Sequence, residues 1–147
     1  MAEPLIVRRE VQIAAPPATV FAFLTDPDKI LRWMGTEATL EPHVDGLYLV
    51  NVTNKNRAEG RFTEVIPVHR LAYSFGWQGN EKIPPRSSLV EIDLIERQDG
   101  TLLRMTHSGL PDAEACAAHE AGWTHYFGRL AVAAAGGDPG PDPRCAA

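Results

Sequence analysis

The chain has 147 residues, of which 44% are hydrophobic and 22% charged, and we expect one soluble globular domain large enough to bury a core. Its net charge is −5 and its longest basic cluster is the pair Arg8 and Arg9. This balance argues against nucleic-acid binding, which needs a concentrated basic surface. No apolar run approaches the roughly 18 residues of a membrane span, and the polar residues 1–10 are typical neither of a secretory signal nor of a transit peptide.

The first predicted strand covers residues 5–13, where apolar and charged side chains alternate. Two short helices follow. Pro17 and Pro27 are well placed in their first turns, where the missing N–H of proline costs nothing. Asp26 is expected to cap the second helix and Gly35 to end it. The apolar residues of the two helices are Val20, Phe21, Leu24, Ile30, Leu31, Trp33 and Met34.

From residue 36 onward the apolar pattern has a period of two, which predicts six strands at 36–41, 47–53, 58–66, 70–77, 88–96 and 101–107. Turn signals such as Asp45-Gly46 and Asp99-Gly100 separate them, so we expect hairpins and an antiparallel sheet. The alternation is sharpest in 70–77. One face of that strand carries Leu71, Tyr73, Phe75 and Trp77.

The last strand leads through a short turn into one long helix that extends to residue 135. Trp123, Phe127 and Leu130 follow a spacing of four and then three, so they form one stripe on this helix. A helix with an aromatic face has to lie across a sheet. A curved sheet that grips such a helix can leave a cavity between them.

Residues 136–147 contain three prolines and cannot continue the helix. We expect this tail to be mobile, and the globular domain to cover residues 5–135. Two cysteines do not make a disulfide framework. Cys116 falls in the long helix and Cys145 in the tail, so we interpret both as reduced thiols of a cytoplasmic protein.

Several short segments, in this order, resemble homologues of the activator of the heat-shock-protein-90 ATPase. They are VQIAAPP at 11–17, VF at 20–21, TDP at 25–27, RWMG at 32–35, GRFTEVIP at 60–67, RL at 70–71, GW at 76–77, THSGL at 106–110 and the segment from His119 to Trp123. Met34 is a departure, since the family usually has tryptophan there. The resemblance covers about residues 5–135. It implies the helix-grip fold of the START-like (SRPBCC) superfamily, which includes the birch-pollen allergen and polyketide cyclases.

The expected fold class is therefore α+β. A curved seven-stranded antiparallel sheet surrounds the long C-terminal helix, and two short helices follow the first strand. The cavity between sheet and helix is the predicted binding site. Its candidate ligand-binding residues are aromatic or inward-facing polar side chains: Trp33, Tyr48, Tyr73, Phe75, Trp77, His107, Trp123 and Phe127. The alternative is that these aromatics simply fill the core.

His107 is the best candidate for a functional polar group. It shares parity with Leu103 and Met105, so it is expected to point inward with them. A buried imidazole can orient a ligand or act as an acid or base, with a pKa set by its burial. The alternative is a structural histidine that is hydrogen-bonded to a carbonyl or hydroxyl group.

A metal site is not expected, and no cofactor is predicted. His119 and Glu120 invite comparison with the zinc-protease helix, but the second histidine of that motif is replaced by Trp123. His119 and His125 are six residues apart and lie on different helix faces. The loop 78–87 is longer than a hairpin needs, and it either borders the cavity or acts as a spacer.

Three functions remain open from the sequence. The leading hypothesis is the binding of a small hydrophobic or aromatic molecule in the cavity. The second is an enzyme of the polyketide cyclase, dehydratase or hydrolase type that uses His107 or a tyrosine. The third, implied by the resemblance, is a co-chaperone-like partner of the 90-kDa heat-shock protein. That role needs an apolar outer sheet face, against which Arg61, Glu64, Glu91 and Asp93 argue. A homodimer is compatible with each of these three functions.

Overall fold

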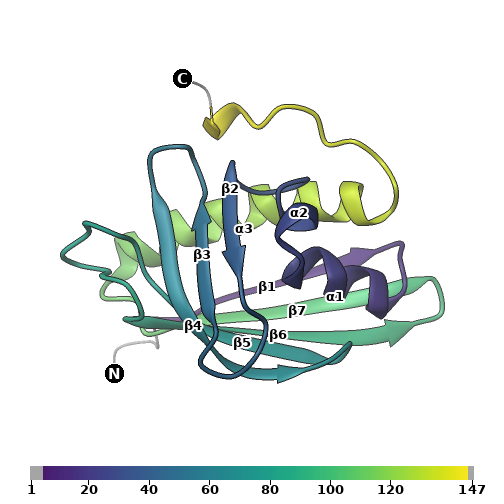
Figure 1. Ribbon diagram of the computed structural model, residues 1–147, viewed down its shortest axis with the longest axis horizontal. Coiled ribbons are helices and arrows are strands. Elements are labelled where there is room, and N and C mark those ends of the chain that lie inside the picture. Colours follow the sequence, from purple (N-terminus) through teal and green to yellow (C-terminus); the bar gives the residue numbers. More distant parts are fainter. Residues whose placement is uncertain (1–4, 146–147) are drawn as a thin grey trace.

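The computed structural model describes residues 5–145, in which a seven-stranded antiparallel sheet curves around a long helix (Figure 1). The strand order is β1-β7-β6-β5-β4-β3-β2. The strands are β1 Val7–Ile13, β2 Glu37–Leu40, β3 Leu47–Asn51, β4 Arg57–Ile66, β5 Arg70–Phe75, β6 Ser88–Arg97 and β7 Gly100–Ser108. The helices are α1 Pro17–Thr25, α2 Pro27–Ile30, α3 Ala113–Ala134 and the 3-10 helix η1 Pro143–Cys145. The predicted fold class is confirmed.

Hairpins connect β2 to β3 and every following pair of strands, and the first strand joins the sheet at its far end. β1 lies antiparallel to β7, with Val7 opposite His107 and Ile13 opposite Thr101. Because side chains alternate across a strand, one set of apolar residues from β5, β6 and β7 faces the concave side, while Leu89, Ile95 and Leu102 have the opposite parity. The concave-facing residues form the core with α3: Leu71, Tyr73, Phe75, Val90, Ile92, Leu94, Leu103 and Met105.

The two short helices close one end of the curve. The carboxylate of Asp26 accepts hydrogen bonds from the backbone N–H groups of Asp28 (2.8 Å) and Lys29 (3.2 Å), which caps α2 as expected. α2 is shorter than predicted, because the chain continues through a turn after Ile30. The indole of Trp33 is buried beyond this turn and donates a hydrogen bond to the carbonyl of Phe23 (2.9 Å).

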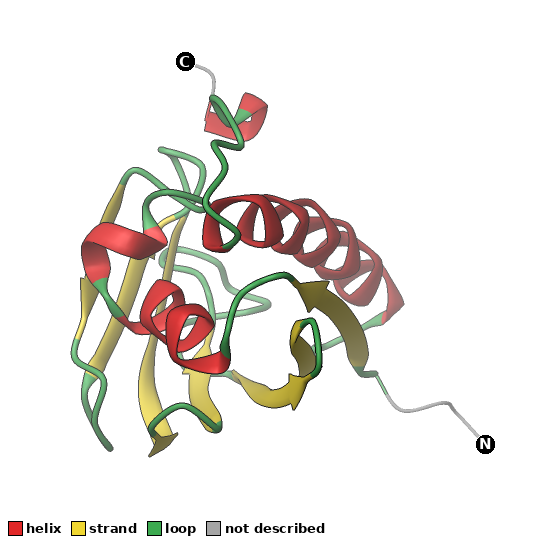
Figure 2. Ribbon diagram, turned by 90° about the vertical axis from the view of Figure 1, so that its right-hand side faces the viewer, coloured by secondary structure: helices red, strands yellow, loops and turns green. Residues whose placement is uncertain are grey.

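α3 runs alongside β1 and passes behind β2, β3 and β4 in the view of Figure 1, and Figure 2 shows the sheet curving beside it. The predicted stripe of Trp123, Phe127 and Leu130 is buried against the sheet. On its other side α3 is held along β1, because Arg9 donates a hydrogen bond through Nε to the hydroxyl of Thr124 (2.8 Å). None of the helices among residues 5–145 is both long and apolar enough to cross a membrane.

The C-terminal segment turns back at Gly136 and runs over α3, as the yellow ribbon in Figure 1 shows. Arg129 of α3 holds it there by donating a hydrogen bond to the carbonyl of Gly140 (2.9 Å). The same guanidinium donates to the carbonyl of Trp33 (2.9 Å). The structure shows these contacts between the segment and the domain, and the mobility that its composition predicts stays a prediction. Residues 146–147 of the predicted tail lie outside the described residues.

Candidate functional site

A cavity of about 420 Å³ opens at one end of the gap between the sheet and α3, and we call it the α3 pocket. The sheet side contributes Phe75 and Trp77, and the start of the following loop contributes residues 78–80. The turn between β3 and β4 supplies a third wall. α3 supplies the opposite wall through Ala118, His119, Gly122, Trp123 and Tyr126. The remaining lining residues include Met34, next to the short helices, and Arg144 of the C-terminal segment.

Three of the predicted ligand-binding residues line this pocket: Phe75, Trp77 and Trp123. Their rings pack edge to face or tilted, with centroids 5.3 Å apart for Phe75 and Trp77 and 6.0 Å apart for Phe75 and Trp123. These rings form an apolar inner wall, which is the surface that an aromatic ligand contacts most favourably.

The other five predicted residues lie in the core behind the pocket: Trp33, Tyr48, Tyr73, His107 and Phe127. Tyr48 stacks on Tyr73 with ring centroids 4.0 Å apart. Burial raises the pKa of Tyr48 to about 12 and that of Tyr73 above its usual range, so both phenols are neutral near pH 7. Contact of these five residues with a ligand stays a prediction that would require a shift of the pocket wall.

His107 is fully buried, and both of its ring nitrogens are hydrogen-bonded. The indole N–H of Trp123 donates to Nδ1 (3.0 Å). Nε2 lies 2.8 Å from the hydroxyl of Ser88, which itself donates to the carbonyl of Phe75 (2.7 Å). Since Nδ1 accepts, the ring is the neutral tautomer with its proton on Nε2. Burial, and to a smaller extent the neighbouring His119, lower the pKa of His107 to about 3.

His119 forms a second indole–imidazole pair at the pocket wall. Its Nδ1 lies 2.7 Å from the carbonyl of Ala115, to which the N–H donates. Its Nε2 accepts a hydrogen bond from the indole N–H of Trp77 (3.0 Å). Burial lowers the pKa of His119, although the bond to Ala115 opposes this effect. The rings of His107 and His119 are 5.2 Å apart, so protonating either one disfavours protonation of the other.

The two histidines are therefore hydrogen-bond acceptors that hold tryptophans in place. Neither has a lone pair free to take a proton from a ligand, which matches the structural alternative considered for His107. Among residues 5–145, no cluster of three or more His, Cys, Asp or Glu side chains has the arrangement of a metal site.

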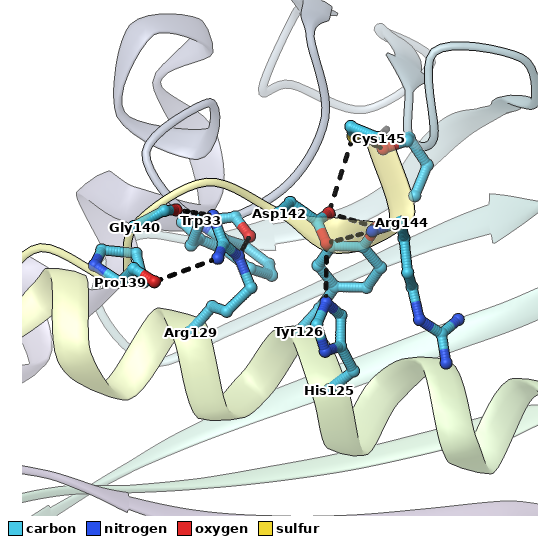
Figure 3. Close-up of polar contacts among 10 residues, drawn as sticks. Trp33, His125, Tyr126, Arg129, Pro139, Gly140, Asp142, Arg144 and Cys145 are labelled. Carbon is cyan, nitrogen blue, oxygen red and sulfur yellow. Dashed lines mark hydrogen bonds and ion pairs between the residues drawn. The ribbon is translucent and has the colours of Figure 1, made fainter. Parts of the chain in front are cut away.

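The C-terminal segment is fixed beside the pocket by Asp142 (Figure 3). Its carboxylate accepts hydrogen bonds from the hydroxyl of Tyr126 (2.7 Å) and from the backbone N–H of Arg144 (2.9 Å), and it lies 2.8 Å from Nε2 of His125. Burial alone would raise the pKa of this carboxyl, but these three hydrogen bonds hold it at about 2. Cys145 completes the contact by donating its S–H to the carbonyl of Val52 (3.2 Å).

Sequence reasoning did not identify several lining residues, above all His119 as a tryptophan partner and Arg144. His119 opens a segment that resembles the family, which was a usable signal. Arg144 had none, because its place at the pocket depends on the path of the whole C-terminal segment. The loop 78–87 borders the pocket only through Gln78, Gly79 and Asn80, while its Ile83 is buried in the core.

The sequence model of one family, described as activator of Hsp90 ATPase homolog 1-like protein, matches residues 14–135. The chain belongs to this family. An AHSA1-like protein from Rhizobium etli, solved by NMR, is 70% identical over 97% of this chain and 89% of its own, with a TM-score of 0.78.

More distant structures share the fold of this AHSA1-like protein. DynU16, from the dynemicin biosynthetic locus, is 26% identical with a TM-score of 0.80, over 93% of this chain but only 49% of its own. The Aha1 dimer from Colwellia psychrerythraea is 19% identical with a TM-score of 0.78, over 90% of this chain and 97% of its own. No match was found among functionally curated proteins.

Proposed function

We propose that this AHSA1-like protein binds a small molecule with an apolar or aromatic body in the α3 pocket. The observation that carries the proposal is a cavity of about 420 Å³ whose inner wall consists of Phe75, Trp77 and Trp123. Ligand sites typically have volumes of about 300–1,000 Å³ and combine apolar walls with a few polar groups at fixed positions. The resemblance to DynU16 is consistent with this proposal, since that protein comes from a biosynthetic locus.

The pocket walls are held in place before any ligand arrives. The indoles of Trp77 and Trp123 are each hydrogen-bonded to an imidazole whose tautomer is set by a second partner. A wall fixed in this way loses little conformational entropy on binding. Burying about 300 Å² of apolar ligand surface contributes about 7–8 kcal/mol, and association costs at least about 4 kcal/mol, so apolar burial alone supports dissociation constants of about 1 mM. Stacking of an aromatic ligand on the three rings adds to this affinity.

The geometry favours neither of the other two functions. The enzyme hypothesis requires an accessible acid or base, whereas His107 is fully buried and hydrogen-bonded at both nitrogens. The co-chaperone hypothesis requires an apolar outer sheet face. That face carries Arg70 in contact with the carboxylates of Glu64, Glu91 and Asp93. We therefore take small-molecule binding as the function and place it in the cytoplasm, which the two unpaired cysteines support.

The test uses the neutral fluorescent probe N-phenyl-1-naphthylamine. Ala118 lines the pocket and Ala117, its neighbour on α3, is exposed outside it. We expect saturable binding to the wild-type protein, at least about tenfold weaker binding to Ala118→Trp because the indole fills the cavity, and unchanged binding to Ala117→Trp. Absence of binding to the wild-type protein, or equal binding to both variants, would refute the proposal.

A further inference from the structure

We propose that the α3 pocket selects amphipathic anions. The apolar body of the ligand enters the pocket, and its single negatively charged group binds the guanidinium of Arg144 at the rim. This inference rests on the proposed function and specifies the ligand class for that same site.

The charges among the lining residues have one sign, because the carboxylate of Asp142, which is bonded to Tyr126 and to the backbone of Arg144, lies outside the lining. The whole chain has 19 acidic residues against 14 basic ones, yet none of the described lining residues is Asp or Glu. Arg144 is the charged side chain among them. His119 is neutral, because its Nε2 accepts the hydrogen bond of Trp77. An anion at the rim thus meets an attractive charge and no carboxylate of the lining.

The backbone of Arg144 is anchored while its side chain is not. Its N–H donates to Asp142, which is tied to Tyr126 on α3. Within residues 5–145, the guanidinium makes no hydrogen bond and no ion pair, and Figure 3 shows it extending towards α3 without a partner. It lies over Gly122, where an added Cβ would be 3.8 Å from Nη1. The small residue keeps the space beside the guanidinium open.

A guanidinium suits this task because its planar N–H donors match a carboxylate or sulfonate in a two-point hydrogen bond. Arg144 is exposed, so its desolvation on binding is limited and the gain in affinity is moderate. Asn80, another residue of the lining, adds a further donor. Its side-chain oxygen accepts the backbone N–H groups of Lys82 and Ile83 (both 2.9 Å), which leaves its NH₂ group available.

The experiment compares two probes that differ by one group. 1-Anilinonaphthalene-8-sulfonate is N-phenyl-1-naphthylamine with an added sulfonate. We expect Arg144→Gln to weaken binding of the sulfonate probe by about fivefold and to leave binding of the neutral probe unchanged. Arg144→Lys retains the charge and is expected to restore part of the loss. Arg97→Gln removes an equal charge at an exposed position outside the pocket and is the matched control.

The outcomes separate the two proposals. If neither probe binds to the wild-type protein, the proposed function itself fails. If the neutral probe binds but Arg144→Gln leaves the sulfonate probe unaffected, the anion inference is overturned. Equal weakening of both probes also overturns it, because Arg144 then acts by holding the C-terminal segment rather than by charge. If Arg97→Gln weakens binding of the sulfonate probe as much as Arg144→Gln does, the effect is one of overall charge, and the anion inference is again overturned.

Discussion

The buried His107 predicts that this protein loses stability in mild acid. Its folded-state pKa of about 3 lies below the value of about 6.5 expected in the unfolded chain. Above pH 6.5 the ring is neutral in both states, and the folded state keeps its full stability. Below pH 6.5, His107 is protonated in the unfolded chain but stays neutral in the folded protein. Stability therefore decreases as the pH is lowered from about 6.5 to about 3.

The magnitude follows from the two pKa values. Lowering the pH from about 7 to about 5 is expected to reduce the free energy of unfolding by about 2 kcal/mol through His107 alone. The structural cause is that a proton on Nδ1 would displace the indole N–H of Trp123 and place a charge 5.2 Å from the ring of His119. A loss of this size is a large part of the about 5–15 kcal/mol that stabilises a typical domain.

The assay is urea denaturation at the two pH values, followed by tryptophan fluorescence, for the wild type, His107→Gln and His69→Gln. His69 is exposed in the turn between β4 and β5 and serves as the matched control. The carboxylates contribute equally to all three proteins, so a difference between the variants in the pH dependence of the unfolding free energy comes from the substituted histidine. We expect the loss of unfolding free energy between the two pH values to be about 2 kcal/mol smaller in His107→Gln than in the wild type and in His69→Gln.

An unchanged pH dependence in His107→Gln would refute this reasoning. If that variant does not fold, NMR titration of the wild-type protein decides the matter. The imidazole resonances of His107 are expected to remain in the neutral form from pH 7 down to about pH 4, and titration near the ordinary histidine pKa would contradict the structure.

Three further predictions concern stability and the C-terminal segment. In urea denaturation, Gly60→Ala is expected to cost about 3 kcal/mol or more of stability, because the added Cβ would lie 1.6 Å from a carbonyl oxygen of β5. Gly128→Ala is the control on α3, where an added Cβ has no neighbour within 4 Å, and it is expected to stabilise the protein by about 0.5–1 kcal/mol. Arg70→Met is expected to cost about 1–2 kcal/mol of stability, because three carboxylates lose their shared cation, and the cost is expected to be smaller in high salt. Arg104→Met breaks one exposed ion pair and is expected to cost at most about 0.5 kcal/mol. Arg129→Met is expected to speed amide hydrogen exchange in residues 138–145, because the carbonyls of that segment lose their donor.

Each of these has an outcome that counts against it. Equal stability of Gly60→Ala and the wild type would mean that β4 and β5 are not as close as described. An Arg104→Met loss as large as that of Arg70→Met would contradict the cluster on the outer face. Fast exchange of residues 138–145 already in the wild-type protein would support the mobility that composition suggests and would contradict the anchoring by Arg129.

The sequence by itself determined the order of elements and the fold. Alternation with a period of two, interrupted by turn residues, specifies which side chains of each strand face the core, and hairpin connections make neighbours pair in order. The stripe of Trp123, Phe127 and Leu130 likewise specifies the buried face of α3. These are local properties, since they depend on residues a few positions apart.

Only the tertiary structure decided which inward residues line a cavity. Tyr73 and Phe75 share one strand face, yet Tyr73 is stacked in the core and Phe75 lines the pocket, because depth under α3 depends on how far the sheet curves. The position of Arg144 depends on the contacts that turn the C-terminal segment back across α3. The tautomer of His107 depends on three elements that meet around it. No local pattern encodes such long-range packing.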